Sequence, residues 1–145
     1  MATSDGIATN DWETIRDLAT TVVNLSGAGD DGALDRKRLL RALDKLEKKY
    51  GRLPSILSTR ADYVDDPELS LSLLKEAYVT ADERSDVKNK AFISSTLSEL
   101  YLETFQRKDL ARFWLKLFKK DLGSYSEDEY LQKLCAELSE SLSEA

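Results

Sequence analysis

The spacing of apolar residues constrains this chain more than any other feature of its sequence. Only six glycines and two prolines interrupt the 145 residues. Between these breaks, apolar side chains recur every three to four positions, which is the period of a helix with one buried face. No segment bounded by turn residues alternates apolar and polar side chains as a half-buried strand does. The sequence therefore predicts an all-α fold of about seven helices in one domain over residues 1–145.

Capping and breaking residues place the first two helices. Asn10 followed by Glu13 is typical of a helix start. The glycine-rich segment 27–32 predicts a flexible loop, after which a helix opens at Asp35 and ends at Gly51, which suits a left-handed cap. We expect these two helices to form an antiparallel pair over residues 10–50.

The remaining helices have similar boundary signals. Pro54 suits a first helical turn, and the run Asp66-Pro67-Glu68 combines a cap, a first-turn proline and an acidic first turn. Ser85 is the expected cap of the next helix, a further one starts near Asp109, and Ser126 begins a capping box. The expected units are helix pairs at residues 53–84 and 85–122, followed by a capping helix at residues 126–142.

The two pairs at 53–84 and 85–122 share a pattern with a period of about 40 residues. In register they match Leu57 with Leu97, Ser58 with Ser98, Ala61 with Tyr101, Ser70 with Ala111, Leu74 with Leu115, and Ala77 with Phe118. Together with the stretches 97–103 and 109–115, this pattern over residues 51–122 resembles tetratricopeptide-like (TPR-like) helical repeats. The resemblance implies a short superhelix of stacked pairs, with a groove for peptides or protein segments and a solvating C-terminal helix. An irregular helical bundle is the alternative.

The inventory of chemically active residues is small. The chain has no histidine and one cysteine, Cys135, so it has neither the usual proton shuttle nor a cysteine set for zinc. Glu99 and Glu103 lie one turn apart and in principle suit a hard cation, but on an exposed helix such a pair usually only solvates the surface. We expect a non-enzyme with no cofactor, no metal site and no catalytic residues.

Charge and hydropathy bear on partners and location. The net charge is -6, with acidic ends and basic segments at residues 35–50 and 85–122. Because acidic segments flank each basic one, we do not expect nucleic acid as a partner. No apolar stretch approaches the roughly 20 residues of a membrane span, and the N-terminus has no signal pattern. The expected location is cytoplasmic, and the oligomeric state stays open.

One candidate binding surface lies on the expected helix that begins at Ser85. If its stripe of Ile93, Leu97, Leu100 and Tyr101 faces the core, a second face remains. That face carries Phe92, Ser95, Glu99 and Leu102, and the resemblance places Thr59, Asp62 and Tyr63 beside it in a groove. The alternative is that Phe92 and Leu102 only contact neighbouring helices.

A second candidate surface is the basic run Arg36, Lys37 and Arg38, in a first helical turn where the dipole disfavours positive charge. Such a run suits an acidic partner. The alternatives are that Asp30, Asp31 and Asp35 neutralise it, or that this basic amphipathic helix contacts membranes.

These features favour a protein-protein interaction module that binds one protein partner. The expected role is a stoichiometric inhibitor of the immunity-protein type or a chaperone-like binder. The acidic ends favour the inhibitor, because acidic inhibitors pair with basic targets. The alternative is an adaptor that reads a short peptide tail, and an enzyme ranks third.

Overall fold

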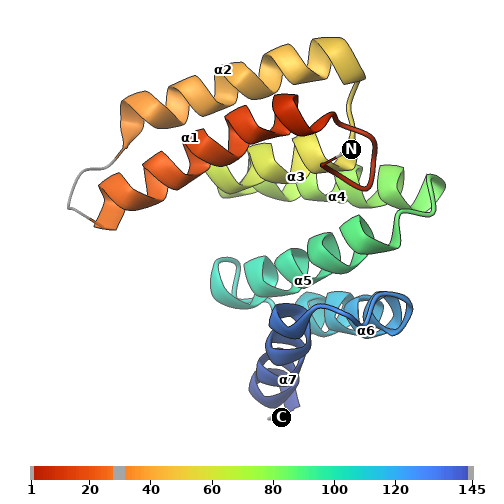
Figure 1. The fold of residues 1–145 in the computed structure, drawn as a ribbon. Helices are drawn as coiled ribbons and strands as arrows, with labels where there is room; N and C mark the ends of the chain where they lie inside the picture. Colours follow the sequence, from red (N-terminus) through yellow and green to blue (C-terminus); the bar gives the residue numbers. More distant parts are fainter. Residues whose placement is uncertain (1, 28–31, 144–145) are drawn as a thin grey trace.

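The computed structural model describes residues 2–27 and 32–143, and within these ranges it contains helices and no strand. The helices are α1 Thr9–Gly27, α2 Ala33–Tyr50, α3 Pro54–Tyr63, α4 Pro67–Glu83, α5 Val87–Glu103, α6 Lys108–Ser124 and α7 Glu129–Ser143. The expectation of an all-α fold with seven helices is therefore confirmed for the described part of the chain (Figure 1).

Consecutive helices pack against each other as hairpins. The pairs are α1 with α2, α3 with α4, and α5 with α6, and α4 also packs on α5. Helix α7 packs against both α5 and α6 at the C-terminal end of the stack (Figure 1). Within the described ranges α2 also packs on α3 and α3 meets α5 directly, whereas the α1 backbone comes close to that of α2 only. The first hairpin thus joins the stack through α2, and the site described below lies on the side where the α1 backbone stays apart from α3 and α5.

Several boundary signals act as the sequence predicts. Pro54 is the first residue of α3, and the Asp66 side chain accepts a hydrogen bond from the Glu68 amide at the start of α4. Gly51 ends α2 as expected and has a positive φ of 89°, but its ψ of -171° lies outside the left-handed helical conformation of the expected cap. These boundaries are correct because the interactions that set them span only a few residues.

Other expected caps are wrong. Helix α1 already includes Asn10, since the Trp12 amide donates to the Ala8 carbonyl. Ser85 instead adopts a left-handed turn with a φ of 54°, and the next residue, Asp86, caps α5. At α7 the amide of the third helical residue donates to Asp128 rather than to Ser126.

The start of α2 also differs from the expectation. Gly32 occupies its N-cap position, and Asp35 lies in its first turn. The expected flexible loop falls mainly on residues 28–31, which lie outside the described residues, as do Asp30 and Asp31.

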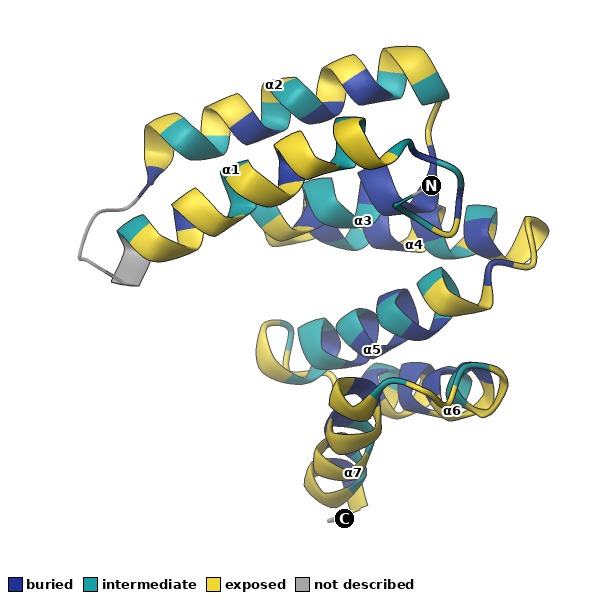
Figure 2. Ribbon diagram, in the orientation of Figure 1, coloured by how far each residue is buried: buried dark blue, intermediate teal, exposed yellow. Residues whose placement is uncertain are grey.

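The buried side chains form two clusters, shown in dark blue in Figure 2. The larger cluster joins α3 to α7 and contains the fully buried Leu97 and Phe118 as well as Trp114, which is 9% exposed. The smaller one joins the first hairpin to the start of α3, through residues such as Ile15 and Leu43. Leu97 and Trp114 are thus core residues, as the sequence predicts.

Two buried serines close the crossings within the second and third hairpins. The Ser70 hydroxyl donates to the Ala61 carbonyl at 2.8 Å, and the Ser98 hydroxyl donates to the Ala111 carbonyl at 2.9 Å. In the sequence register Ser70 aligns with Ala111, so the donor lies on the second helix of one pair and on the first helix of the other. Small residues at these points allow the backbones to approach closely.

Residues 2–8, hereafter the N-terminal segment, connect the first hairpin to the rest. The buried Asp5 carboxylate accepts from the Ser55 amide at 2.7 Å and from its hydroxyl at 2.9 Å. This contact caps α3, whose own N-cap residue, Leu53, has no side-chain hydrogen bond to offer. Ser4 donates to Asp86, the cap of α5, at 2.7 Å. The segment therefore holds the starts of α3 and α5 in one arrangement.

Candidate functional site

A pocket of about 250 Å³ lies between α1, α3 and α5, at the point where the first hairpin diverges from the stack. Its lining combines residues of α1, α3 and α5 and one residue of α4 with the N-terminal segment. The lining residues are Ala2, Thr3, Ser4, Trp12, Ser55, Ser58, Thr59, Asp62, Leu74, Lys88, Asn89, Phe92, Ile93 and Thr96.

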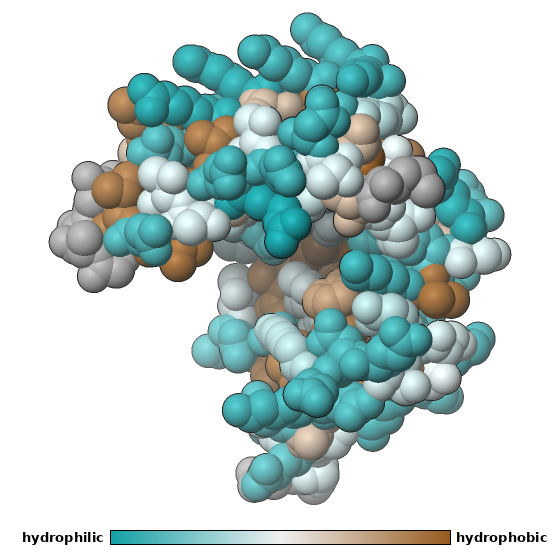
Figure 3. All heavy atoms as spheres, in the orientation of Figure 1, coloured by the Kyte–Doolittle hydropathy of each residue, from teal (hydrophilic) through white to brown (hydrophobic). Residues whose placement is uncertain are grey.

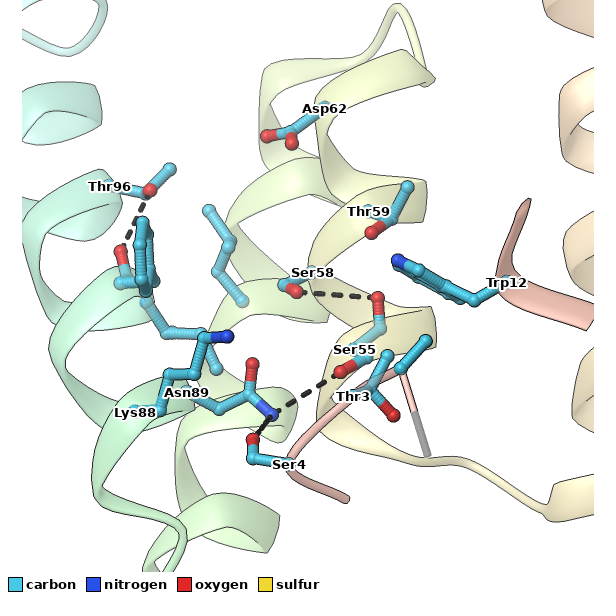
Figure 4. Close-up of a pocket in the computed structure, with 14 residues that line it drawn as sticks. Thr3, Ser4, Trp12, Ser55, Ser58, Thr59, Asp62, Lys88, Asn89 and Thr96 are labelled. Carbon is cyan, nitrogen blue, oxygen red and sulfur yellow. Dashed lines mark hydrogen bonds between the residues drawn. The ribbon is translucent and has the colours of Figure 1, made fainter. Parts of the chain in front are cut away.

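Figure 4 shows how these side chains are arranged. Helix α3 runs along the middle with Ser58, Thr59 and Asp62, Trp12 projects from α1 on one side, and Thr96 lies across from it on α5. The opening lies where the α1 backbone stays apart from the backbones of α3 and α5. The pocket thus has an apolar indole on one wall and polar side chains along its base.

The N-terminal end of the pocket is closed by a hydrogen-bonded network. The Asn89 amide donates to the Ser4 hydroxyl at 3.1 Å and to the Ser55 hydroxyl at 3.3 Å (Figure 4). It also donates to Asp86 at 2.6 Å. These partners hold one another, so this end is a rigid wall. Lys88 lies beside it and supplies the positive charge at this end.

The opposite end of the pocket is acidic. Asp62 lies in the last turn of α3, where solvent still reaches its side chain, but the surrounding walls withdraw much of the water that would solvate a carboxylate. This desolvation raises the pKa of Asp62 to about 6. Among the described residues Asp62 has no ion-pair partner.

A second, separate pocket is lined by Glu99, Tyr130, Lys133, Leu134 and Glu137. Burial raises the pKa of Glu99, and the charges of Glu103, Glu137 and Asp62 raise it further. Burial and the neighbouring carboxylates likewise raise the pKa of Tyr130, which is 57% exposed. Three helices therefore converge on one acidic patch, in which Lys133 is the cation that lines the second pocket.

We call the two pockets together the groove, because Asp62 lines the first and lies close enough to Glu99 in the second to act on its pKa. Figure 3 shows the hollow between the first hairpin and α5, with hydrophobic side chains inside a largely hydrophilic rim. The groove therefore combines an apolar interior with an acidic end.

The structure brings four of the seven expected groove residues together: Thr59, Asp62 and Phe92 line the first pocket, and Glu99 lines the second. Tyr63 instead packs half-buried against the smaller core cluster, and Leu102 packs against the larger one. Ser95 is 2% exposed and donates to the Phe92 carbonyl, so its expected place on an open face is wrong. It is buried because α5 packs against α3, α4, α6 and α7 and keeps little free surface.

The basic run at the start of α2 is separate from the groove lining. Arg36 forms an ion pair with Asp65 at 2.9 Å, and Arg38 pairs with Asp35 at 3.2 Å. Lys37 is exposed. Asp35 therefore does neutralise part of the run, as the alternative interpretation states, while Asp65 was not anticipated.

Most residues that line the groove were missed from the sequence, among them Trp12, Thr96, Tyr130 and Glu137. Trp12 and Tyr130 both lie at helical spacing among apolar residues, a pattern that usually marks a core. The only signal in the sequence for an open face was that the apolar residues of α1 and α7 spread over more of the helix surface than a single buried face.

Metal binding and membrane crossing have no support in the described part of the chain. No group of three or more histidine, cysteine, aspartate or glutamate side chains there could hold a metal ion. No helix in the same residues has the length and apolar character that crossing a bilayer requires. The chain matches no protein-family model, no curated protein and no solved structure.

Proposed function

We propose that this protein is a protein-protein interaction module that holds a segment of one partner protein in the groove. The observation that carries the proposal is the joint lining of the groove by α1, α3, α5 and α7, with Trp12, Phe92 and Tyr130 reachable from solvent. Aromatic side chains accessible in a concave surface are typical anchors of protein interfaces.

The rigidity of the groove supports this role. The N-terminal segment holds the starts of α3 and α5 through Asp5, Ser4 and Asn89. A preformed surface loses little conformational entropy when it binds, so more of the contact energy contributes to affinity.

Within this class, we favour a stoichiometric inhibitor of the immunity-protein type or a chaperone-like binder, acting without a cofactor and without catalysis. Its acidic patch would steer a basic target toward the groove. An adaptor that reads a short peptide tail is the second candidate, and the 250 Å³ pocket, bounded at one end by the N-terminal segment, supports it. An inhibitor needs contacts along the whole groove, whereas a tail reader needs only this pocket.

Site-specific crosslinking tests the proposal. The photoreactive residue p-benzoylphenylalanine is placed at Thr96 or Thr59 inside the first pocket, at Glu137 in the second pocket, and at the exposed Val79 of α4 as the matched control. Irradiation in an extract of the source cell should join one protein to the groove positions and not to Val79.

The pattern of crosslinks separates the candidates. Crosslinks from both pockets support the inhibitor or chaperone, and crosslinks from Thr96 and Thr59 alone support the tail reader. Equal labelling at Val79, or labelling only there, would show that the groove is not the interface.

A further inference from the structure

The acidic end of the groove brings several carboxylates near one another, at helix positions that disfavour negative charge. Asp62 occupies the last turn of α3 and Glu103 the last turn of α5. The helix dipole is negative at these ends, so carboxylates are disfavoured there. Glu99, Glu137 and Asp62 also repel one another, as the raised pKa of Glu99 reflects.

The carboxylates elsewhere on the surface are often paired. Asp11 binds Lys49 at 2.8 Å, and Glu76 binds Arg52 at 2.6 Å. In the groove, by contrast, none of the described ion pairs includes Asp62, Glu99 or Glu137. Lys133 alone lines the second pocket with these carboxylates, so the patch keeps a net negative charge.

The aromatic side chain beside these carboxylates completes the arrangement. Tyr130 lines the second pocket with Glu99 and Glu137, and more than half of its surface is open to solvent. An aromatic ring next to carboxylates binds lysine and arginine through two interactions. The negative face of the ring attracts the cation, and the carboxylates form ion pairs with it.

We propose that the acidic end of the groove binds a cationic, amphipathic segment of the partner protein. A lysine or arginine of this segment lies between Asp62, Glu99 and Glu137 against the Tyr130 ring, and its apolar side chains enter the pocket beside Trp12 and Phe92. This inference rests on the proposed function and adds the chemistry of the partner to it. Charge complementarity selects this occupant over an acidic tail or a second copy of this chain, whose net charge is also negative.

The test uses the full chain and three synthetic amphipathic peptides of equal length, built from leucine with lysine, with glutamate or with glutamine. Affinity is measured by calorimetry, and the fluorescence of Trp12 reports whether the peptide occupies the pocket. A Trp12→Phe variant separates this signal from that of the buried Trp114. We expect the lysine peptide to bind at least about tenfold more tightly than the other two.

The key variant is Asp62→Asn combined with Glu99→Gln. Its matched control, Glu68→Gln with Glu83→Gln, removes the same charge from exposed positions of α4 outside the groove. The groove variant should weaken the lysine peptide by about tenfold or more, and the control by less than about threefold. Thermal unfolding of both variants checks that they remain folded.

Several results would overturn the inference. Equal weakening by both variants would mean that only the net charge attracts the peptide, and tighter binding of the glutamate peptide would reverse the assigned charge. If the glutamine peptide binds as tightly as the lysine peptide, or if no peptide binds, the proposal of a cationic segment is wrong. The proposed function is decided separately, by whether the crosslinks of the natural partner map to the groove.

Discussion

At the scale of single residues, Asp62 shows how the surroundings of a side chain change its chemistry. It lies at the end of α3, yet the groove walls desolvate it and raise its pKa to about 6. The charged or titratable groups that face it are Tyr63 on its own helix and Glu99 on α5, with Tyr130 on α7. None of these is a cation, so the ionised form of Asp62 is disfavoured in the unbound protein.

The first prediction follows from this pKa. An aspartate of the unfolded chain has a pKa near 3.9, so between roughly pH 4 and pH 6 the folded state binds more protons than the unfolded state. The contribution of Asp62 to stability therefore falls as the pH rises through this range. Asp62→Asn should be more stable than the parent at pH 7, by about 0.5–1 kcal/mol after allowance for solvent screening, and the difference should vanish near pH 4.

Urea unfolding at both pH values measures this difference, and carbon NMR of the Asp62 carboxyl measures its pKa directly. If Asp62→Asn is no more stable than the parent at pH 7, and the Asp62 carboxyl of the parent titrates near 4, the groove does not desolvate Asp62.

A second prediction concerns the core. Leu97 is fully buried between α5 and its neighbours, so Leu97→Ala should lower the free energy of unfolding by about 2–5 kcal/mol. Val79→Ala, at a position 57% exposed, is the control and should change it by less than about 0.5 kcal/mol. Chemical denaturation monitored by circular dichroism distinguishes the two. Similar small losses for both would place the α5 core face elsewhere.

At the scale of elements, the N-terminal segment supplies the N-terminal cap of α3, which a helix usually receives from the residue just before it. Asp5 caps α3 from a position 50 residues earlier in the chain, and Ser4 reaches the cap of α5. This segment, the smaller core cluster and the packing of α2 on α3 together join the first hairpin to the stack.

The third prediction tests this junction. Asp5→Ala leaves the Ser55 amide without its acceptor and should cost about 1–3 kcal/mol of unfolding free energy. It should also speed hydrogen exchange at the first amides of α3 more than at those of α6. Asp17→Ala, at an exposed position of α1, is the control. If both variants exchange and unfold alike, Asp5 does not hold the start of α3.

At the scale of the whole molecule, the groove results from the offset of one hairpin from two others. Its apolar part lies between α1, α3 and α5, and its acidic part lies between α3, α5 and α7. This division predicts that the two parts contribute differently to the binding of the partner.

The fourth prediction is a kinetic separation. Phe92→Ala removes an apolar contact inside the pocket and should mainly speed dissociation, by an amount equivalent to about 1–3 kcal/mol. Glu99→Lys reverses a charge at the acidic end and should mainly slow association, with an effect that shrinks as salt is added. Surface plasmon resonance with the crosslinked partner measures both rates.

Because Phe92 also packs against the larger core cluster, the thermal stability of each variant is measured alongside. Two folded variants with the parent's association and dissociation rates would contradict the groove as the interface.

The helices, the main core face and several caps follow from the sequence alone. Leu97 and Trp114 could be assigned to the core because apolar residues at helical spacing share one face of a helix. Pro54 and Asp66 could be assigned to helix starts because capping interactions act within one turn. Local rules failed where two signals compete over neighbouring residues, as at Ser85, where the next residue became the cap.

Only the tertiary structure decided which helix faces stay open. Trp12 and Ser95 both lie on amphipathic helices, yet the first lines the groove and the second is buried. The difference arises because α1 lacks a neighbour on one side while α5 packs against several helices. The acidic patch likewise needs Asp62, Glu99 and Glu137 from three helices to come together. Helix periodicity shows which side chains share a face, but the packing of distant helices determines what that face meets.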